Sequence, residues 1–275
     1  MIQQFFEMLS YPFMARAIIV GILVSLCAAL LGVSLILKRY SMIGDGLSHV
    51  GFGALALAQV LGFAPLAFSI PVMVIIAILL LRLSETGKTK GDAAIAIIST
   101  GALAFGVMAI YFSNGANTDL VNYMFGSILA MNNSDVTLSI CLSLAVLILF
   151  VFFYNKIFAV TFDETFAKAT GKKTGFYNAV IAALTAVTIV LGMRMMGTLL
   201  ISALVVFPGL TAMRVCRSFK SVTIVSVILA AVCFFVGMTA SYFYAAPTGA
   251  SIVLVNIFAF VLFSVVGAVK SGRNR

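Results

Sequence analysis

Long apolar runs recur along the whole chain, and they restrict its possible folds more than any other feature. Three of them, at residues 175–193, 221–244 and 250–269, contain no charged residue. About 20 apolar residues in a helix cross the hydrocarbon core of a bilayer. A membrane β-barrel is excluded, because its strands alternate between apolar and polar residues and these runs are continuous. The sequence therefore predicts an all-α, polytopic membrane protein.

Composition agrees with this class. Hydrophobic residues make up 63% of the chain and charged residues only 9%, whereas soluble domains carry about 25% charged residues. The chain has 17 Lys and Arg against 8 Asp and Glu. Most of these cations lie in short connections between apolar runs, as expected for cytoplasmic loops, and this pattern does not call for a nucleic-acid partner.

Counting runs by length gives about nine membrane spans in one domain, residues 1–275, whose membrane region is 14–269. We expect a short interfacial segment at 1–13, a surface or re-entrant helix at 120–131, and a cytoplasmic connection at 156–174. The odd count places the two termini on opposite sides, with nearly all basic loops inside. The expected spans are 15–37, 42–62, 65–83, 92–112, 135–154, 175–193, 198–213, 221–244 and 250–269.

The second expected span carries an aspartate and the only histidine of the chain. Residues 44–53 read GDGLSHVGFG, so Asp45 and His49 are four residues apart and share one face of a helix. Both side chains can bind a divalent metal, and ionisable groups inside a membrane usually mark a functional site. A structural ion pair that locks two helices is the alternative.

Small residues surround this pair. Gly44 and Ser48 permit either close helix contact or a cavity lined by backbone, and we include both as candidate pathway residues. Two donors do not complete a coordination sphere, but two facing copies of the chain would supply four. Pro208, inside the span 198–213, is a third pathway candidate, because proline breaks the helical hydrogen-bond pattern and broken helices often line transport paths.

Residues 162–171 read FDETFAKATG. Asp163 and Glu164 at the start and Gly171 at the end are typical of a short capped helix. Phe162 and Phe166 are spaced to share one face, which favours docking to a partner protein. A solvated connector is the alternative.

The chain lacks a nucleotide-binding loop of its own. Residues 87–89 read GKT, but Arg82 stands where the phosphate-binding motif requires glycine. An intramembrane aspartyl protease would need a second carboxylate facing Asp45, and no other span offers one at mid-membrane depth. We therefore expect a transport subunit without enzymatic activity, which would take its energy from another protein.

Four stretches, in their order and spacing, resemble the membrane permeases of bacterial ABC importers for zinc, manganese and iron. They are SMIGDGLSH at 41–49, FDETFAKATG at 162–171, GTLLISALVVFP at 197–208 and PTGASIVL at 247–254. The resemblance implies a homodimer in the bacterial cell membrane, a cytoplasmic ABC ATPase dimer and an extracytoplasmic metal-binding protein. It places Asp45 and His49 on the metal path, and the ATPase-coupling helix at Phe162, Asp163, Glu164, Phe166 and Gly171.

On this reading Zn²⁺ or Mn²⁺ is cargo and no cofactor is permanently bound. Zinc is the first expectation, because it binds nitrogen and oxygen sites more tightly than manganese. The alternative function is a self-contained, proton-coupled exchanger or channel for divalent cations. Such carriers tend to chain several intramembrane ionisable groups, and the sequence offers one pair.

Overall fold

The computed structural model describes residues 10–85, 91–113 and 133–272, and the regular structure of these residues is helical. Most of the interfacial segment expected at 1–13 and all of the helix expected at 120–131 lie outside the described residues. The helices are α2 (Pro12–Leu37), α3 (Ser41–Val60), α4 (Pro65–Glu85), α5 (Gly91–Phe112), α7 (Asn133–Phe162), α8 (Glu164–Ala169), α9 (Thr174–Met196), α10 (Thr198–Met213), α11 (Phe219–Tyr244) and α12 (Thr248–Gly272).

The structure confirms a multi-pass helical membrane protein, but it does not confirm nine spans. Within the described residues, seven helices are long and apolar enough to cross a membrane: α2, α4, α5, α7, α9, α11 and α12. The other two expected spans form helices that do not meet the same criterion. α3 has 20 residues but includes Asp45, His49 and Gln59 among them, and α10 has only 16 residues.

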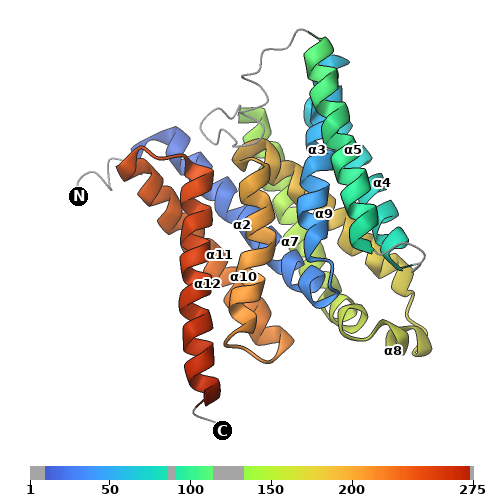
Figure 1. Ribbon diagram of the computed structural model, residues 1–275, viewed down its shortest axis with the longest axis vertical. Helices are drawn as coiled ribbons and strands as arrows, with labels where there is room; N and C mark the ends of the chain where they lie inside the picture. The colour runs from blue at the N-terminus through green and yellow to red at the C-terminus, as the bar shows by residue number, and fades with distance from the viewer. Residues whose placement is uncertain (1–9, 86–90, 114–132, 273–275) are drawn as a thin grey trace.

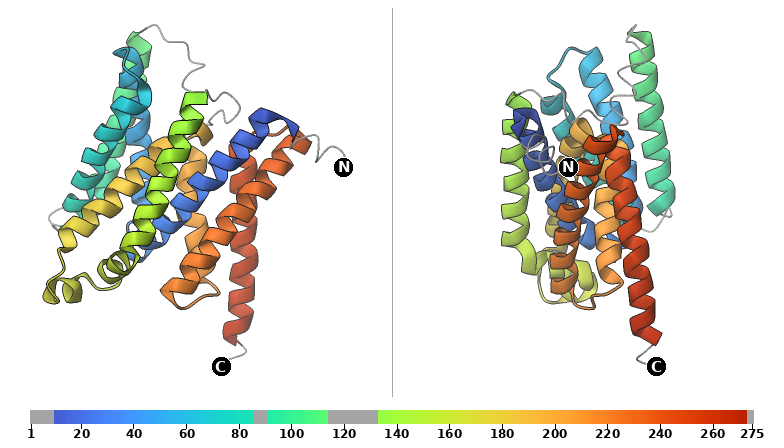
Figure 2. Two further views of the ribbon diagram at one scale, coloured as in Figure 1. Left: turned by 180° about the vertical axis from the view of Figure 1, so that it is seen from behind. Right: turned by 90° about the vertical axis from the view of Figure 1, so that its left-hand side faces the viewer.

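The helices form two groups that meet along α2, α9 and α10. α3 packs against α4, α5, α9 and α10, while α11 and α12 pack against α10 on the other side (Figure 1). From behind, α2, α7 and α9 lie side by side (Figure 2). The helix that carries the Asp45/His49 pair is therefore enclosed on several sides by other helices.

The basic connections gather at one end of the molecule. In Figure 1 the chain enters α2 near the top, and the turn from α2 to α3, helix α8, the connection from α10 to α11 and the end of α12 all lie toward the bottom. These segments, with the connection from α8 to α9 and the first turn of α11, hold cations of the sequence's basic loops: Lys38, Arg39, Lys168, Lys172, Lys173, Arg214, Arg217, Lys220 and Lys270. The charge rule therefore predicts that this end faces the cytoplasm.

One boundary differs clearly from the expectation. α7 runs for 30 residues, from Asn133 to Phe162, so the connection expected at 156–174 begins with helix. Asn155 and Lys156 mark where the chain becomes polar, but neither residue ends a helix. The non-helical part of this connection begins at Asp163.

Glycines set the distance between the central helices. A Cβ atom added to Gly32 of α2 would lie 1.9 Å from the carbonyl oxygen of Val205 in α10. A Cβ atom on Gly106 of α5 would lie 2.8 Å from the Cα atom of Gly53 in α3. Small residues allow this close approach in membrane bundles, where packing replaces the hydrophobic driving force.

We predict that Gly32→Ala destabilises the bundle, because the added carbon meets backbone that cannot rotate away. Overpacking of this kind costs about 1–3 kcal/mol. Gly101→Ala in α5 is the matched control, since an added Cβ there meets nothing within 4 Å. Thermal stability in detergent, followed by size-exclusion chromatography after heating, should fall for Gly32→Ala only. Equal behaviour of the two variants would contradict this account of the α2–α10 contact.

Candidate functional site

Asp45 and His49 lie one turn apart on the same face of α3, as predicted. The distance from His49 Nε2 to Asp45 Oδ2 is 3.7 Å, and the side chains are 31% and 52% exposed. This is too long for a hydrogen bond. It matches two ligands of one ion, because donor atoms about 2.1 Å from a tetrahedral metal stand about 3.4 Å apart. The spacing of the pair is therefore compatible with two ligands of one ion.

The described residues contain no group of three or more His, Cys, Asp and Glu side chains that could hold a metal together. Within the part of the chain that the structure describes, the pair thus offers two such donors, an oxygen and a nitrogen. Further ligands would be water or groups from another chain, and the exposure of both side chains leaves room for them.

The open face of α3 ends close to His49. One turn further along the same face, Phe52 and Ala56 are 1% and 0% exposed. The ring of Phe52 packs against Gly106 of α5, where an added Cβ would lie 3.0 Å from it. Beyond His49 this face of α3 is therefore closed by packing against α5.

The small residues around the pair serve helix contact rather than an open cavity. The positions of an added Cβ show that Gly44 faces α10, Gly46 and Gly53 face α5, and Gly51 faces Met193 of α9. Of the two readings left open by the sequence, close packing is the one found at these glycines. Packing on three sides leaves the face of Asp45 and His49 as the accessible one.

Ser48 connects α3 to α10. Its hydroxyl is fully buried, donates to the carbonyl oxygen of Asp45 at 2.7 Å, and accepts a hydrogen bond from Ser202 Oγ at 3.3 Å. Ser202 was not singled out from the sequence, although a serine within the apolar run 198–213 is a signal that could have found it. Pro208 lies further along α10, where its carbonyl oxygen accepts a hydrogen bond from Ser226 of α11. No described hydrogen bond joins it to the pair.

The short capped helix expected at 162–171 is present as α8. The Asp163 carboxylate accepts a hydrogen bond from the Phe166 N–H at 2.8 Å, and Gly171 adopts a positive φ of 75° at the other end. Phe162 and Phe166 are exposed by 74% and 64%. Our expectation that they share one continuous helical face is wrong, because Phe162 ends α7 and the extended residue Asp163 separates it from α8.

A partly buried polar cluster ties α8 to the turn between α2 and α3. Lys38 Nζ lies 2.6 Å from Asn178 Oδ1 and 3.3 Å from Glu164 Oε2. The Asn178 amide donates to the same carboxylate oxygen at 3.2 Å. The Lys38 side chain is only 7% exposed, so this charge is held inside the protein. Asn178 belongs to α9, so α2, α8 and α9 meet in this cluster.

The environment of Glu164 favours its charged form. Partial burial raises the pKa of this carboxyl, but hydrogen bonds from Lys168 and Asn178 and the charge of Lys38 outweigh it and hold the pKa below its ordinary value. A depressed folded-state pKa means that the ion pair is intact at neutral pH. It is lost only as pH falls through that lowered value.

Between Lys38 and α3 the chain makes a tight turn. The Tyr40 N–H donates to Leu35 O at 2.8 Å and the Arg39 N–H to Ile36 O at 2.9 Å, which is a Schellman motif. Arg39 takes the left-handed position with φ 63°, where glycine is usual and where another residue costs roughly 1–2 kcal/mol. The turn therefore joins the Lys38 cluster to α3 within three residues.

Comparison with known proteins agrees with the metal-permease resemblance. The chain is 30% identical to the manganese import system permease protein ScaB of Streptococcus gordonii, over 95% of this chain and 94% of that protein. It is also 30% identical to the high-affinity zinc uptake system membrane protein ZnuB of Haemophilus influenzae, over 90% and 94%.

A solved structure is similar over nearly the whole chain. PsaBC from Streptococcus pneumoniae in complex with Fab matches with a TM-score of 0.86 and 30% identity, covering 96% of this chain and 95% of that one. Residues 10–267 match the ABC 3 transport family, so the match includes α3 with its pair, α8 and the Lys38 cluster. The chain therefore belongs to the ABC 3 transport family of membrane permeases.

Proposed function

We propose that this chain is the membrane permease subunit of an ATP-driven importer for a divalent transition-metal ion. The observation that carries the proposal is the 3.7 Å separation of Asp45 Oδ2 and His49 Nε2 on an enclosed helix, in a chain of the ABC 3 transport family. Relatives named for manganese and for zinc are equally similar. The family therefore does not choose between the two metals, and zinc stays our first expectation on affinity.

The partners follow from what the chain lacks. It has no phosphate-binding loop in its sequence, so ATP hydrolysis belongs to a separate ABC ATPase dimer on the cytoplasmic side. An extracytoplasmic metal-binding protein would deliver the ion. A second copy of the permease would bring a second Asp45/His49 pair, and two pairs fill a four-coordinate site. Family membership does not favour the alternative of a self-contained exchanger.

The Lys38 cluster supplies a route from ATP to the metal. Closure of the ATPase dimer would push on α8 through the exposed rings of Phe162 and Phe166. Glu164 would pass that displacement to Lys38, and the tight turn at Arg39 would pass it to α3. Movement of α3 would change the position of Asp45 and His49 relative to α5. It would also change the contact between Phe52 of α3 and Gly106 of α5, which closes the path.

We predict that Asp45→Asn and His49→Ala each reduce metal uptake by cells at least about 100-fold. Loss of a partner that only orients a ligand costs about 10–100-fold in metal affinity or activity, and a direct ligand should cost no less. Uptake of zinc, manganese and iron is measured by mass spectrometry of washed cells, and co-purification with the ATPase checks assembly. Asp45→Glu keeps an oxygen donor and should retain more uptake. Normal uptake in both variants would remove the pair from the path.

We predict that Phe162→Asp and Phe166→Asp weaken binding of the ATPase by roughly 30-fold, because buried aromatic residues contribute about 2 kcal/mol or more to protein interfaces. Phe166→Leu keeps an apolar side chain and should bind nearly normally. Binding is measured by titrating the purified ATPase onto the permease in nanodiscs. Equal affinity of the Asp variants and the unaltered chain would count against α8 as the docking helix.

We predict that Lys38→Met uncouples transport, so that the ATPase still binds and hydrolyses ATP while metal uptake per ATP falls by at least about tenfold. The Lys38–Glu164 pair is partly buried, with side chains 7% and 28% exposed, and loss of about 1.4 kcal/mol of interaction already corresponds to a factor of ten. Lys168→Met is the matched control: Lys168 Nζ lies 2.8 Å from Glu164 Oε1, but its side chain is 63% exposed. Surface pairs contribute about 0–1 kcal/mol, so coupling should survive.

Uptake and ATP hydrolysis are measured together in proteoliposomes that contain the binding protein. Unchanged coupling in Lys38→Met, with the permease correctly folded, would show that force reaches α3 by another route.

A further inference from the structure

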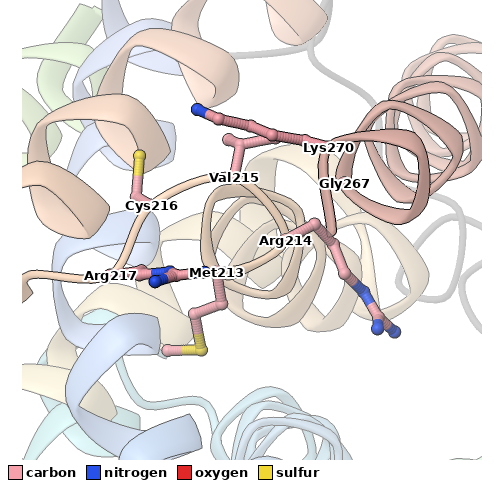
Figure 3. Close-up of a pocket in the computed structure, with 7 residues that line it drawn as sticks. All are labelled: Met213, Arg214, Val215, Cys216, Arg217, Gly267 and Lys270. Carbon is pink, nitrogen blue, oxygen red and sulfur yellow. The ribbon is translucent and has the colours of Figure 1, made fainter. Parts of the chain in front are cut away.

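The basic end of the molecule also holds a cavity, away from α3 and α8. This cavity of about 440 Å³ opens between the last residues of α10, the connection from α10 to α11, and the final turns of α12 (Figure 3). Its lining residues are Met213, Arg214, Val215, Cys216, Arg217, Gly267 and Lys270. Nothing in the transport route described above uses this cavity.

The cavity is positively charged. Three of its lining residues are cations, and none is a carboxylate. Among the described residues, the ion pairs join Lys38, Lys168 and His49 to carboxylates, and none of them includes a cation of this cavity. Figure 3 shows the Lys270 side chain extending across the α10–α11 connection, while Arg214 projects to the other side. The cations therefore surround the cavity instead of meeting at one point, which suits a bulky anion.

The neighbouring face of α12 is apolar and exposed. α12 has the smallest buried share, 11%, among the seven membrane-spanning helices. The residues before and beside the cavity on this helix include Leu262, Val265, Val266 and Val269, exposed by 47%, 59%, 49% and 67%. The guanidinium of Arg214 lies 5.2 Å from the centre of the Phe260 ring on the same helix, where a cation–π contact holds it at the border between polar and apolar surface.

A close contact between α12 and the connection from α10 to α11 shapes the cavity at Gly267. A Cβ atom on Gly267 would lie 2.6 Å from the carbonyl oxygen of Arg214, so a larger residue there would push α12 away from the connection. The cavity thus depends on glycine at this position.

We propose that this cavity binds the phosphate headgroup of an anionic phospholipid from the cytoplasmic leaflet, such as phosphatidylglycerol. Basic pockets between transmembrane helices on the cytoplasmic side bind such headgroups. The adjoining apolar face of α12 would receive the acyl chains of the lipid. Free phosphate, a nucleotide or an acidic protein segment has no acyl chain and would leave that face uncovered. The site is independent of the metal path, so its test does not depend on transport.

The first test measures lipid binding to the purified, full-length chain by native mass spectrometry. Phosphatidylglycerol is titrated against phosphatidylcholine, which carries a phosphate without net charge, and against inorganic phosphate. The double variant Arg217→Gln/Lys270→Gln should bind phosphatidylglycerol about 25-fold more weakly, since each cation near an anionic lipid contributes about fivefold. The control Lys156→Gln/Lys220→Gln removes the same charge from exposed positions at the same end, outside the lining, and should bind normally.

Equal loss in both double variants would overturn the site in favour of general attraction to a basic surface. Inorganic phosphate that displaces the lipid at similar concentration would overturn the lipid assignment.

The second test keeps the lining intact. Cys216 lies in the wall of the cavity, Cys27 and Cys233 are buried, and Cys141 is exposed. In a Cys141→Ser background, a thiol reagent should modify Cys216 more slowly in nanodiscs of phosphatidylglycerol than in nanodiscs of phosphatidylcholine, with no partner protein present. The same modification rate in both lipids, or protection that requires the ATPase, would overturn the proposal.

Discussion

The fold depends on keeping one polar helix out of contact with lipid. α3 carries an aspartate and a histidine, and an ionisable side chain at the bilayer centre costs several kcal/mol when it faces acyl chains. The remaining helices meet part of this constraint by packing against α3 on the sides that carry glycine, while the face of the pair would be shielded by the second copy proposed above. Gly44, Gly46, Gly51 and Gly53 let α10, α5 and α9 approach closely, and only the face of Asp45 and His49 stays accessible. The glycines therefore determine which sides of α3 are packed and which side presents the two ionisable residues.

The same constraint explains the position of the second buried charge. Lys38 has a side chain that is 7% exposed, and such a charge is stable only with partners that satisfy it. Glu164 and Asn178 supply them from α8 and α9. Because Asn178 also binds Glu164, the three residues hold one another. A helix that lies outside the membrane span is thereby fixed to the turn that begins α3.

Local properties of this fold could be predicted from the sequence. Continuous apolar runs predicted the membrane class, the four-residue spacing placed Asp45 and His49 on one face, and the Asp163 and Gly171 positions predicted a capped helix. The errors were also local. Polarity near Lys156 does not mark the end of α7. Asp163 caps α8 by adopting an extended conformation, which breaks the expected face of Phe162 and Phe166.

Contacts between distant segments could not be predicted in this way. Lys38 and Glu164 are 126 residues apart and Ser48 and Ser202 are 154 residues apart. Periodicity along one helix does not say which other helix it meets. The number of spans was difficult to predict for a different reason. α3 and α10 are helices, but α3 is less apolar and α10 is shorter than the seven helices that could cross a membrane. α3 is less apolar since it carries the candidate site, and α10, which packs against several other helices, has only 16 residues.

An incomplete site is consistent with transport and would be a poor choice for storage. A complete cage of protein ligands holds a structural metal by about 10–16 kcal/mol, and an ion held so tightly would not leave on the time scale of ATP turnover. One chain supplies two donors and open coordination positions, so a site completed only by the proposed second copy would release its ion when the two copies move apart, as conduction requires. Release alone would allow the ion to leak back, so access must change in step with hydrolysis. The closed contact between Phe52 and Gly106 lies on the same helix as the donors, and the Lys38 cluster lies at the start of that helix. Under the proposed function, moving α3 as a unit would alter both ligand position and access, and the turn at Arg39 would be the point where energy from a partner subunit acts on the ion.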